Sequence, residues 1–173
     1  MDRIQLKLCD IQGRLFELST NYESESFIRA FMTSEVAEHL DSPYNKLQWM
    51  GEEYLLEELE DEKELRVSGE HYNTEVLYWI GYLYRYWACS RGESSRKIYR
   101  QAPARMMKRN YLMFHTLDPE VAIDDLKEIH AQRRKQAKNC VTMNRNLERN
   151  RKTCDKTERW YLLIFHFYLL YNG

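Results

Sequence analysis

The sequence contains few residues that favour turns. Among its 173 residues, six are glycine and three are proline. Folds made of many short β-strands need turns at short intervals, and glycine and proline are the residues that most often form them. The composition therefore argues against a β-sandwich or a repeat of short strands.

The sequence also lacks the composition of a disordered or a two-domain protein. Hydrophobic residues make up 43% of the chain and charged residues 31%, which is too apolar for a disordered segment. The length suits one hydrophobic core and is short for two. We predict an all-α fold: a compact domain of six to eight helices over residues 1–131, a basic linker or ragged helix at 132–159, and an apolar segment at 160–173.

Patterns typical of metal sites, secretion and common enzymes are absent too. The four cysteines form no CxxC pair and the five histidines are scattered singly, so we expect free thiols and no metal. No glycine-rich phosphate loop, HExxH motif or Ser/His/Asp spacing occurs. Met1 leads directly into a charged amphipathic stretch rather than a signal peptide. These absences predict a cytoplasmic protein without a cofactor and argue against an enzyme of a common kind.

The apolar segment near the end of the sequence has twelve residues without a formal charge, Trp160 to Tyr171. As a helix it would be about 18 Å long, whereas the hydrocarbon core of a bilayer is roughly 30 Å thick. We therefore expect no transmembrane span. Docking on the helical domain or pairing with a second copy, which would give a homo-oligomer, is favoured over lying in a membrane interface behind the basic flank.

Two helices stand out by their periodicity. Apolar residues recur at intervals of three and four from Ile4 to Leu18, which predicts an amphipathic first helix. The segment from Thr74 to Cys89 is apolar on nearly all sides, so we predict that it is the central helix. Its predicted core face carries Val76, Trp79, Ile80, Leu83 and Trp87.

A second stripe on the predicted central helix contains Tyr78, Tyr82 and Tyr86, at spacings of four residues. Buried tyrosine hydroxyls need hydrogen-bond partners, so this stripe either packs on the core with its edge in water or contacts another protein. Structural packing is the commoner role of such a stripe. If a protein partner binds, these three side chains are the aromatic candidates.

Charge is distributed unevenly along a chain whose net charge is −1. Residues 1–90 carry a net charge of −10, residues 91–110 carry +6, and residues 133–160 carry +7. Such asymmetry favours a charged partner. An acidic run follows Gly51; a solvated helix face is its plainer interpretation, and steering of a basic partner is the functional one. The candidate steering residues are Glu52, Glu53, Glu57 and Glu58.

The basic stretch offers nucleic-acid binding as an alternative. Its Lys and Arg side chains surround a possible helix-turn-helix and would hold phosphates, with Tyr99 available for stacking. The candidates are Arg91, Arg96, Lys97, Arg100, Arg105, Lys108 and Arg109. The acidic first half opposes this interpretation, because its charge repels a polyanion.

Ribonuclease chemistry is a second alternative. Arg109, Asn110 and His115 resemble the Arg, polar residue, short spacer and His signature of the HEPN ribonucleases, which are all-α proteins with composite, metal-independent sites. That resemblance implies that His115 moves the proton of an attacking 2′-hydroxyl and that Arg109 holds the phosphate. On a regular helix, six residues place these two side chains about 120° apart, so the site requires a bend or a helix end between them.

Five stretches between about Asp10 and His130 carry a further resemblance. They are DIQGRLFELS, LDSPYNKLQWMGEEYLLEE, YWIGYLYRYW, GESSRKIYRQAP and RNYLMFHTLDPEVAIDDLKEI. They resemble a family of small helical proteins of gut Firmicutes and their mobile elements, encoded beside an ADP-ribosyltransferase-like protein in an arrangement like a toxin–antitoxin locus. The resemblance implies a neutralising or accessory role and brings no catalytic motif. The residues after Gln132 depart from the family pattern.

Together these features predict a protein-binding module. It would neutralise or assist a toxin encoded next to it, or inhibit another enzyme. The tyrosine stripe would supply the contact and the acids of the acidic run would raise the association rate. A HEPN-like ribonuclease and a DNA-binding autoregulator remain the alternatives.

Overall fold

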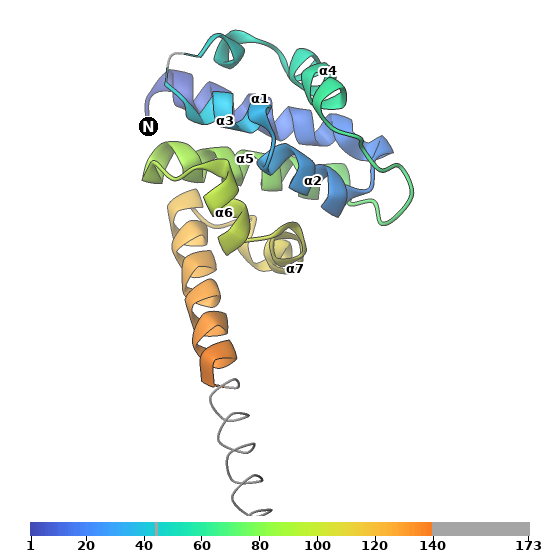
Figure 1. The fold of residues 1–173 in the computed structure, drawn as a ribbon. Coiled ribbons are helices and arrows are strands. Elements are labelled where there is room, and N and C mark those ends of the chain that lie inside the picture. Colours follow the sequence, from blue (N-terminus) through green and yellow to red (C-terminus); the bar gives the residue numbers. More distant parts are fainter. Residues whose placement is uncertain (44, 140–173) are drawn as a thin grey trace, which may run out of the picture. The chain divides into compact units, whose positions relative to one another are not determined.

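The computed structural model describes residues 1–43 and 45–139, and the regular structure in these ranges is entirely helical (Figure 1). The predicted all-α fold is confirmed. The helices are α1 (Arg3–Leu18), α2 (Ser24–Met32), α3 (Glu35–Asp41), α4 (Glu52–Glu62), α5 (Thr74–Arg91), α6 (Ser95–Gln101), α7 (Ala104–Phe114) and a last helix at 119–139. Two short 3-10 turns, η1 (Ser19–Asn21) and η2 (Lys46–Trp49), lie between them.

The chain divides into two compact units, Met1–His130 and Ala131–Gly173. The first unit contains an apolar core to which every helix from α1 to α7 contributes, together with the beginning of the last helix. Of the predicted basic linker, residues 132–139 are described and are helical. The apolar segment at 160–173 lies outside the described residues, so its docking or pairing with a second copy stays a prediction.

The centre of the first unit is the packing of α5 along α1 (Figure 1). The two backbones come very close at Gly81, where a Cβ atom would lie 2.5 Å from the carbonyl oxygen of Gln12 and 2.9 Å from the ring of Phe16. Only glycine leaves room for this approach. The Gln12 side chain reinforces it by donating a hydrogen bond of 3.0 Å to the carbonyl oxygen of Gly81. The prediction that this segment forms the central helix is confirmed.

The buried face of α1 contains the middle of the predicted stripe, Leu8, Ile11 and Leu15, and extends beyond it on one side. Ile4 and Leu18, at the two ends of the stripe, are exposed. Cys9, Gln12 and Phe16 are buried as well, because α5 meets α1 at Gln12 and Phe16.

The predicted core face of α5 is confirmed at Ile80, Leu83 and Trp87, which are fully buried, and is wrong at its first two positions. Val76 and Trp79 are only partly buried, whereas Tyr84 and Arg85 are fully buried. This helix contacts α6 and α7 as well as α1, so neighbours cover much of its circumference. The Tyr84 hydroxyl meets its need for a partner by donating to the carbonyl oxygen of Ala102.

Local hydrogen bonds fix where several helices begin and end. Asp2 and Gln5 form a capping box at the start of α1, in which each side chain accepts a hydrogen bond from the backbone amide of the other. At the start of α3, the amide of Glu35 donates to the carboxylate of Glu62, the last residue of α4. Gly92 ends α5 in the left-handed conformation, with φ at 62°.

Glu93 ties the last helix to α5 and α6. Its carboxylate accepts hydrogen bonds of 2.7 Å from Lys127 and from Gln101, pairs with Lys97 at 3.1 Å, and lies 3.5 Å from the indole nitrogen of Trp87. Burial disfavours the ionised carboxylate, but these donors outweigh it and hold the pKa of Glu93 at about 2.

We expect Gly81→Ala to lower the free energy of unfolding by about 3 kcal/mol, because the new Cβ displaces backbone rather than a flexible side chain. Gly51→Ala is the matched control, since a Cβ at Gly51 meets nothing closer than 3.4 Å. It should cost about 1 kcal/mol or less. Urea unfolding followed by circular dichroism measures both variants, and equal losses would contradict the tight packing of α5 on α1.

The low pKa of Glu93 predicts a pH-dependent contribution to stability. A carboxyl whose pKa lies below its ordinary value of 4.5 stabilises the folded state above that pH and loses this contribution as the pH falls through about 2. Glu93→Gln should therefore be less stable than the unsubstituted protein at pH 7, and the difference should shrink between pH 4.5 and pH 2. Thermal unfolding at a series of pH values measures this difference in stability. A difference as large at pH 2 as at pH 7 would contradict the prediction. Glu57→Gln, at an exposed position of α4, is the control.

Candidate functional site

Arg85 is the one charged side chain that is fully buried among the described residues, with 1% of its surface exposed. Its Nε donates a hydrogen bond of 2.7 Å to the side-chain oxygen of Gln12. One terminal nitrogen donates to Asp41 at 2.7 Å and the other to the Ser95 hydroxyl at 3.3 Å. Each nitrogen of the guanidinium therefore has a partner, and the partners come from α1, α3 and α6. A buried charge is stable only with such compensation.

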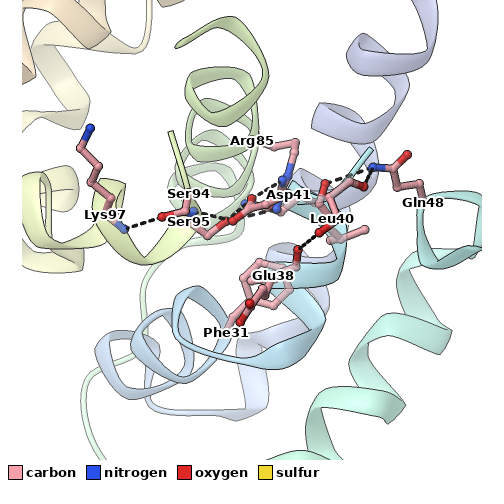
Figure 2. A network of polar contacts seen from close by, with 12 residues as sticks. Phe31, Glu38, Leu40, Asp41, Gln48, Arg85, Ser94, Ser95 and Lys97 are labelled. Carbon is pink, nitrogen blue, oxygen red and sulfur yellow. Dashed lines mark hydrogen bonds and ion pairs between the residues drawn. The ribbon is translucent and has the colours of Figure 1, made fainter. Parts of the chain in front are cut away.

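Asp41 connects this network to the start of α6 (Figure 2). Its carboxylate accepts a hydrogen bond of 2.7 Å from the backbone amide of Ser95 and one of 2.8 Å from the Ser95 hydroxyl. A carboxylate is favoured at this place because the first amides of a helix have no partner within the helix. Asp41 and Arg85 are hydrogen-bonded to one another and to Ser95, and the network connects four helices. Because the Asp41 carboxylate is engaged in these bonds, the network offers no free general base.

A pocket of about 550 Å³ opens beside the network. Arg85, Asp41 and Cys89 contribute to its wall, and Trp49, whose side chain is 70% exposed, lines it as well. The volume suits a small molecule. Within residues 1–43 and 45–139, no group of three or more His, Cys, Asp and Glu side chains is placed to bind a metal ion.

Two cysteines meet at the wall of this pocket. Cys9 on α1 and Cys89 on α5 are free cysteines, and their thiols interact with one another. Interaction with the Cys9 thiol lowers the pKa of Cys89 against the effect of burial, and the charge of Arg85 acts in the same direction. Cys89 lines the pocket, whereas Cys9 is fully buried.

The predicted contact tyrosines form a row along α5. The ring centroids of Tyr78 and Tyr82 are 6.0 Å apart and those of Tyr82 and Tyr86 are 6.3 Å apart, both in stacked geometry. All three side chains are half-buried. The Tyr78 hydroxyl donates to Asp10 at 2.8 Å and the Tyr86 hydroxyl to Glu120 at 3.4 Å. The Tyr82 hydroxyl, in the middle of the row, has no hydrogen-bond partner among the described residues.

The structure connects this row to the acidic helix α4 through α1. Asp10, which accepts from Tyr78, pairs with Arg14 at 2.8 Å. Arg14 in turn lies 3.9 Å from the carboxylate of Glu52. A chain of polar contacts thus runs from α5 across α1 to α4, and it brings together two sets of residues that are separate in the sequence. We call the three tyrosines, Asp10, Arg14 and the acids of α4 the tyrosine–acid surface.

The four predicted steering acids all lie on α4. Glu53 and Glu57 are exposed, whereas Glu52 and Glu58 are half-buried. Glu58 also accepts a hydrogen bond from Tyr54, and this bond raises the pKa of that tyrosine. The two exposed acids are therefore the members of the set that are best placed to act on a partner at a distance.

The predicted nucleic-acid cluster is largely engaged within the chain. Four of its members form ion pairs: Arg91 with Asp124, Lys97 with Glu93, Arg105 with Glu25, and Lys108 with Glu70. Arg96 donates to the carbonyl oxygen of Thr33, while Arg100 and Arg109 are exposed. This pairing reduces the positive charge that the cluster presents to phosphates.

The predicted HEPN-like residues are not brought together within one chain. Helix α7 is regular through Phe114, so the side chains of Arg109 and His115 point about 120° apart. The His115 ring stacks on Tyr111 with its Nδ1 2.9 Å from the carbonyl oxygen of that residue. Asn110 donates to the carbonyl oxygen of Met106.

Sequence reasoning missed the network and the cysteine pair. Arg85 is the only charged residue between Val76 and Ser90, and a single charge in an apolar helix is a signal of a buried, paired ion. No comparable signal marks Asp41, which is 44 residues away from Arg85. Cys9 and Cys89 become neighbours only through the packing of α1 on α5.

Comparison of the chain with protein-family models, with curated proteins and with solved structures finds no match. The resemblance to the Firmicutes helical proteins therefore stays a prediction. Within the described ranges, no helix combines the length and apolarity that crossing a bilayer requires.

A double-mutant cycle tests the buried ion pair. Arg85→Met and Asp41→Asn should each lower the free energy of unfolding by about 3–5 kcal/mol, because each leaves a buried polar partner uncompensated. The double variant should lose clearly less than the sum of the two. Arg91→Met, which breaks a more exposed ion pair, should cost about 1 kcal/mol or less. Chemical denaturation gives all four values, and simple additivity would contradict the coupling of Arg85 with Asp41.

Proposed function

We propose that this chain is a protein-binding module whose contact site is the tyrosine–acid surface. The observation that carries the proposal is the row of Tyr78, Tyr82 and Tyr86, half-exposed and stacked on the central helix, with acids at its edges. Tyrosine is among the residues enriched in the energetically dominant parts of protein interfaces.

The geometry of the row suits binding because its side chains are already ordered. Stacking between neighbouring rings and the hydrogen bonds to Asp10 and Glu120 restrict their rotamers. A partner that binds there loses less free energy to side-chain ordering. Tyr82 lies between the other two rings and has a hydroxyl that a partner can engage, so it is the expected centre of the interface.

The acids define the chemistry of the partner. Residues 1–90 carry a net charge of −10, and the exposed carboxylates of Glu53 and Glu57 extend the surface onto α4. Complementarity therefore favours a basic protein, whose association these charges would accelerate. Nucleic acid is the weaker candidate, because four of the basic side chains predicted for it are paired with acids of the same chain.

The basic partner that we favour is a toxin encoded next to this protein, which the chain would neutralise or assist in the cytoplasm. The sequence resemblance to helical proteins of toxin–antitoxin-like loci supports this choice. A basic surface around a nucleotide or nucleic-acid site is a common feature of enzymes that act on such substrates, so inhibition of another enzyme by the same surface is the related possibility.

Affinity measurements on the tyrosine row test the contact site. The full chain is used to capture the products of neighbouring open reading frames, and binding to the captured protein is measured by surface plasmon resonance. Tyr82→Ala should weaken the complex about 30-fold, mainly through faster dissociation. Trp49→Ala, which removes an exposed aromatic side chain outside the surface, should leave the affinity unchanged.

The same complex tests the role of the acids. Glu53→Lys with Glu57→Lys should slow association about tenfold at low salt and should make the rate less sensitive to added salt. Glu38→Lys, at an exposed position of α3, is the single-charge control. If no neighbouring product is captured and co-expression leaves the growth inhibition by the suspected toxin untouched, the assignment to a toxin is wrong.

A further inference from the structure

The pair of Cys9 and Cys89 is a chemical feature that a plain helical scaffold does not require. The two residues lie on α1 and α5, the helices with the most extensive contact in the first unit. Each is about one helical turn from the contact of Gln12 with Arg85, and their thiols interact. Cys9 is fully buried. Cys89 is half-buried and lines the pocket of about 550 Å³. One thiol is thus reachable from the pocket, and the second lies buried on the facing helix.

The surroundings favour a reactive thiolate at Cys89. The guanidinium of Arg85 is fixed one turn before it on the same helix, and its positive charge acts on both thiols. The carboxylates that oppose it are those of Asp41 and Asp2; Asp41 is itself neutralised by its ion pair with Arg85. A cation and a thiol donor beside a cysteine are the usual means by which proteins activate sulfur as a nucleophile.

We propose that Cys89 is a site of oxidation by small hydroperoxides that enter the pocket, and that Cys9 resolves the oxidised product as an intramolecular disulfide. This modification is independent of the proposed protein-binding function, since neither cysteine belongs to the tyrosine–acid surface.

The reaction takes place in two steps. The Cys89 sulfur attacks one peroxide oxygen and the O–O bond breaks; Cys89 becomes a sulfenic acid, and the peroxide leaves as water or an alcohol with the thiol proton. The Cys9 sulfur then attacks the sulfenic sulfur, an S–S bond forms, and the hydroxyl group leaves as water with the Cys9 proton. The two thiols lose two electrons in total, and the hydroperoxide gains them.

Because the two cysteines differ in exposure, we expect different oxidation products when either one is removed. Cys89 without Cys9 can be oxidised but has no resolving thiol next to it. Cys9 without Cys89 has no access from the pocket. The order of the steps, with Cys89 first and Cys9 second, follows from this difference in exposure.

The test uses the full chain with Cys140→Ser and Cys154→Ser, so that only the pair remains. After exposure of the folded protein to hydrogen peroxide, mass spectrometry should show loss of both thiols together, a disulfide-linked pair of peptides from α1 and α5, and recovery on reduction. In the same background, Cys9→Ser should accumulate a sulfenic acid on Cys89 that dimedone traps, whereas Cys89→Ser should leave Cys9 unmodified until the protein is unfolded.

A second measurement separates activation from mere proximity. The alkylation rate of Cys89 by iodoacetamide at pH 7 should fall about tenfold in Cys9→Ala and much less in Cys9→Ser, which keeps a hydrogen-bond donor. Circular dichroism of each variant confirms that it is folded. The proposal is overturned if both thiols survive peroxide that oxidises free cysteine, if the disulfides that form are intermolecular, or if dimedone labels Cys89 equally with and without Cys9.

Discussion

The buried charge of Arg85 is the constraint on which the rest of the first unit depends. An ion in an apolar interior has to be surrounded by fixed partners, and those partners are supplied by Gln12, Asp41 and Ser95 from three other helices. Gln12 also bonds the backbone of α5 at Gly81, where the two helices come closest. The hydrogen bonds that compensate the charge of Arg85 and the close packing at Gly81 therefore require the same placement of α1 on α5, and the two features depend on one another.

The other charged side chains fall into two groups, those that form ion pairs within the chain and those that do not. Most of the basic side chains between Arg91 and Lys108 hold the chain together through ion pairs with its own acids. Glu93 does the same from the acidic side. Among the described residues, the carboxylates of Glu53 and Glu57 form no ion pair, and they lie on α4, which Arg14 connects to the tyrosine row. The tyrosine–acid surface is thus acidic and aromatic, although the net charge of the chain is close to zero.

The sequence allows the fold class to be predicted because helix periodicity and the scarcity of turn residues are local properties. It identifies the buried face of α5 only in part, since a helix that is apolar on nearly all sides has no single preferred face until its neighbours are placed. Ile80, Leu83 and Trp87 are buried as predicted, whereas the burial of Tyr84 and Arg85 is not predicted. The tyrosine row is visible from spacing alone. Its connection to Glu52 depends on Asp10 and Arg14 of a third helix, which no spacing rule supplies.

The packing of α1 against α5 has a consequence for how the protein is made. The N-terminal helix is synthesised first, but the backbone that it packs against follows 69 residues later. At a synthesis rate of 5–20 residues per second, the nascent α1 waits for roughly 3–14 seconds before α5 covers the face that meets Gly81. During that interval its apolar face is available to chaperones and to other nascent chains. Completion of α5 on the ribosome is thus the event that removes this surface.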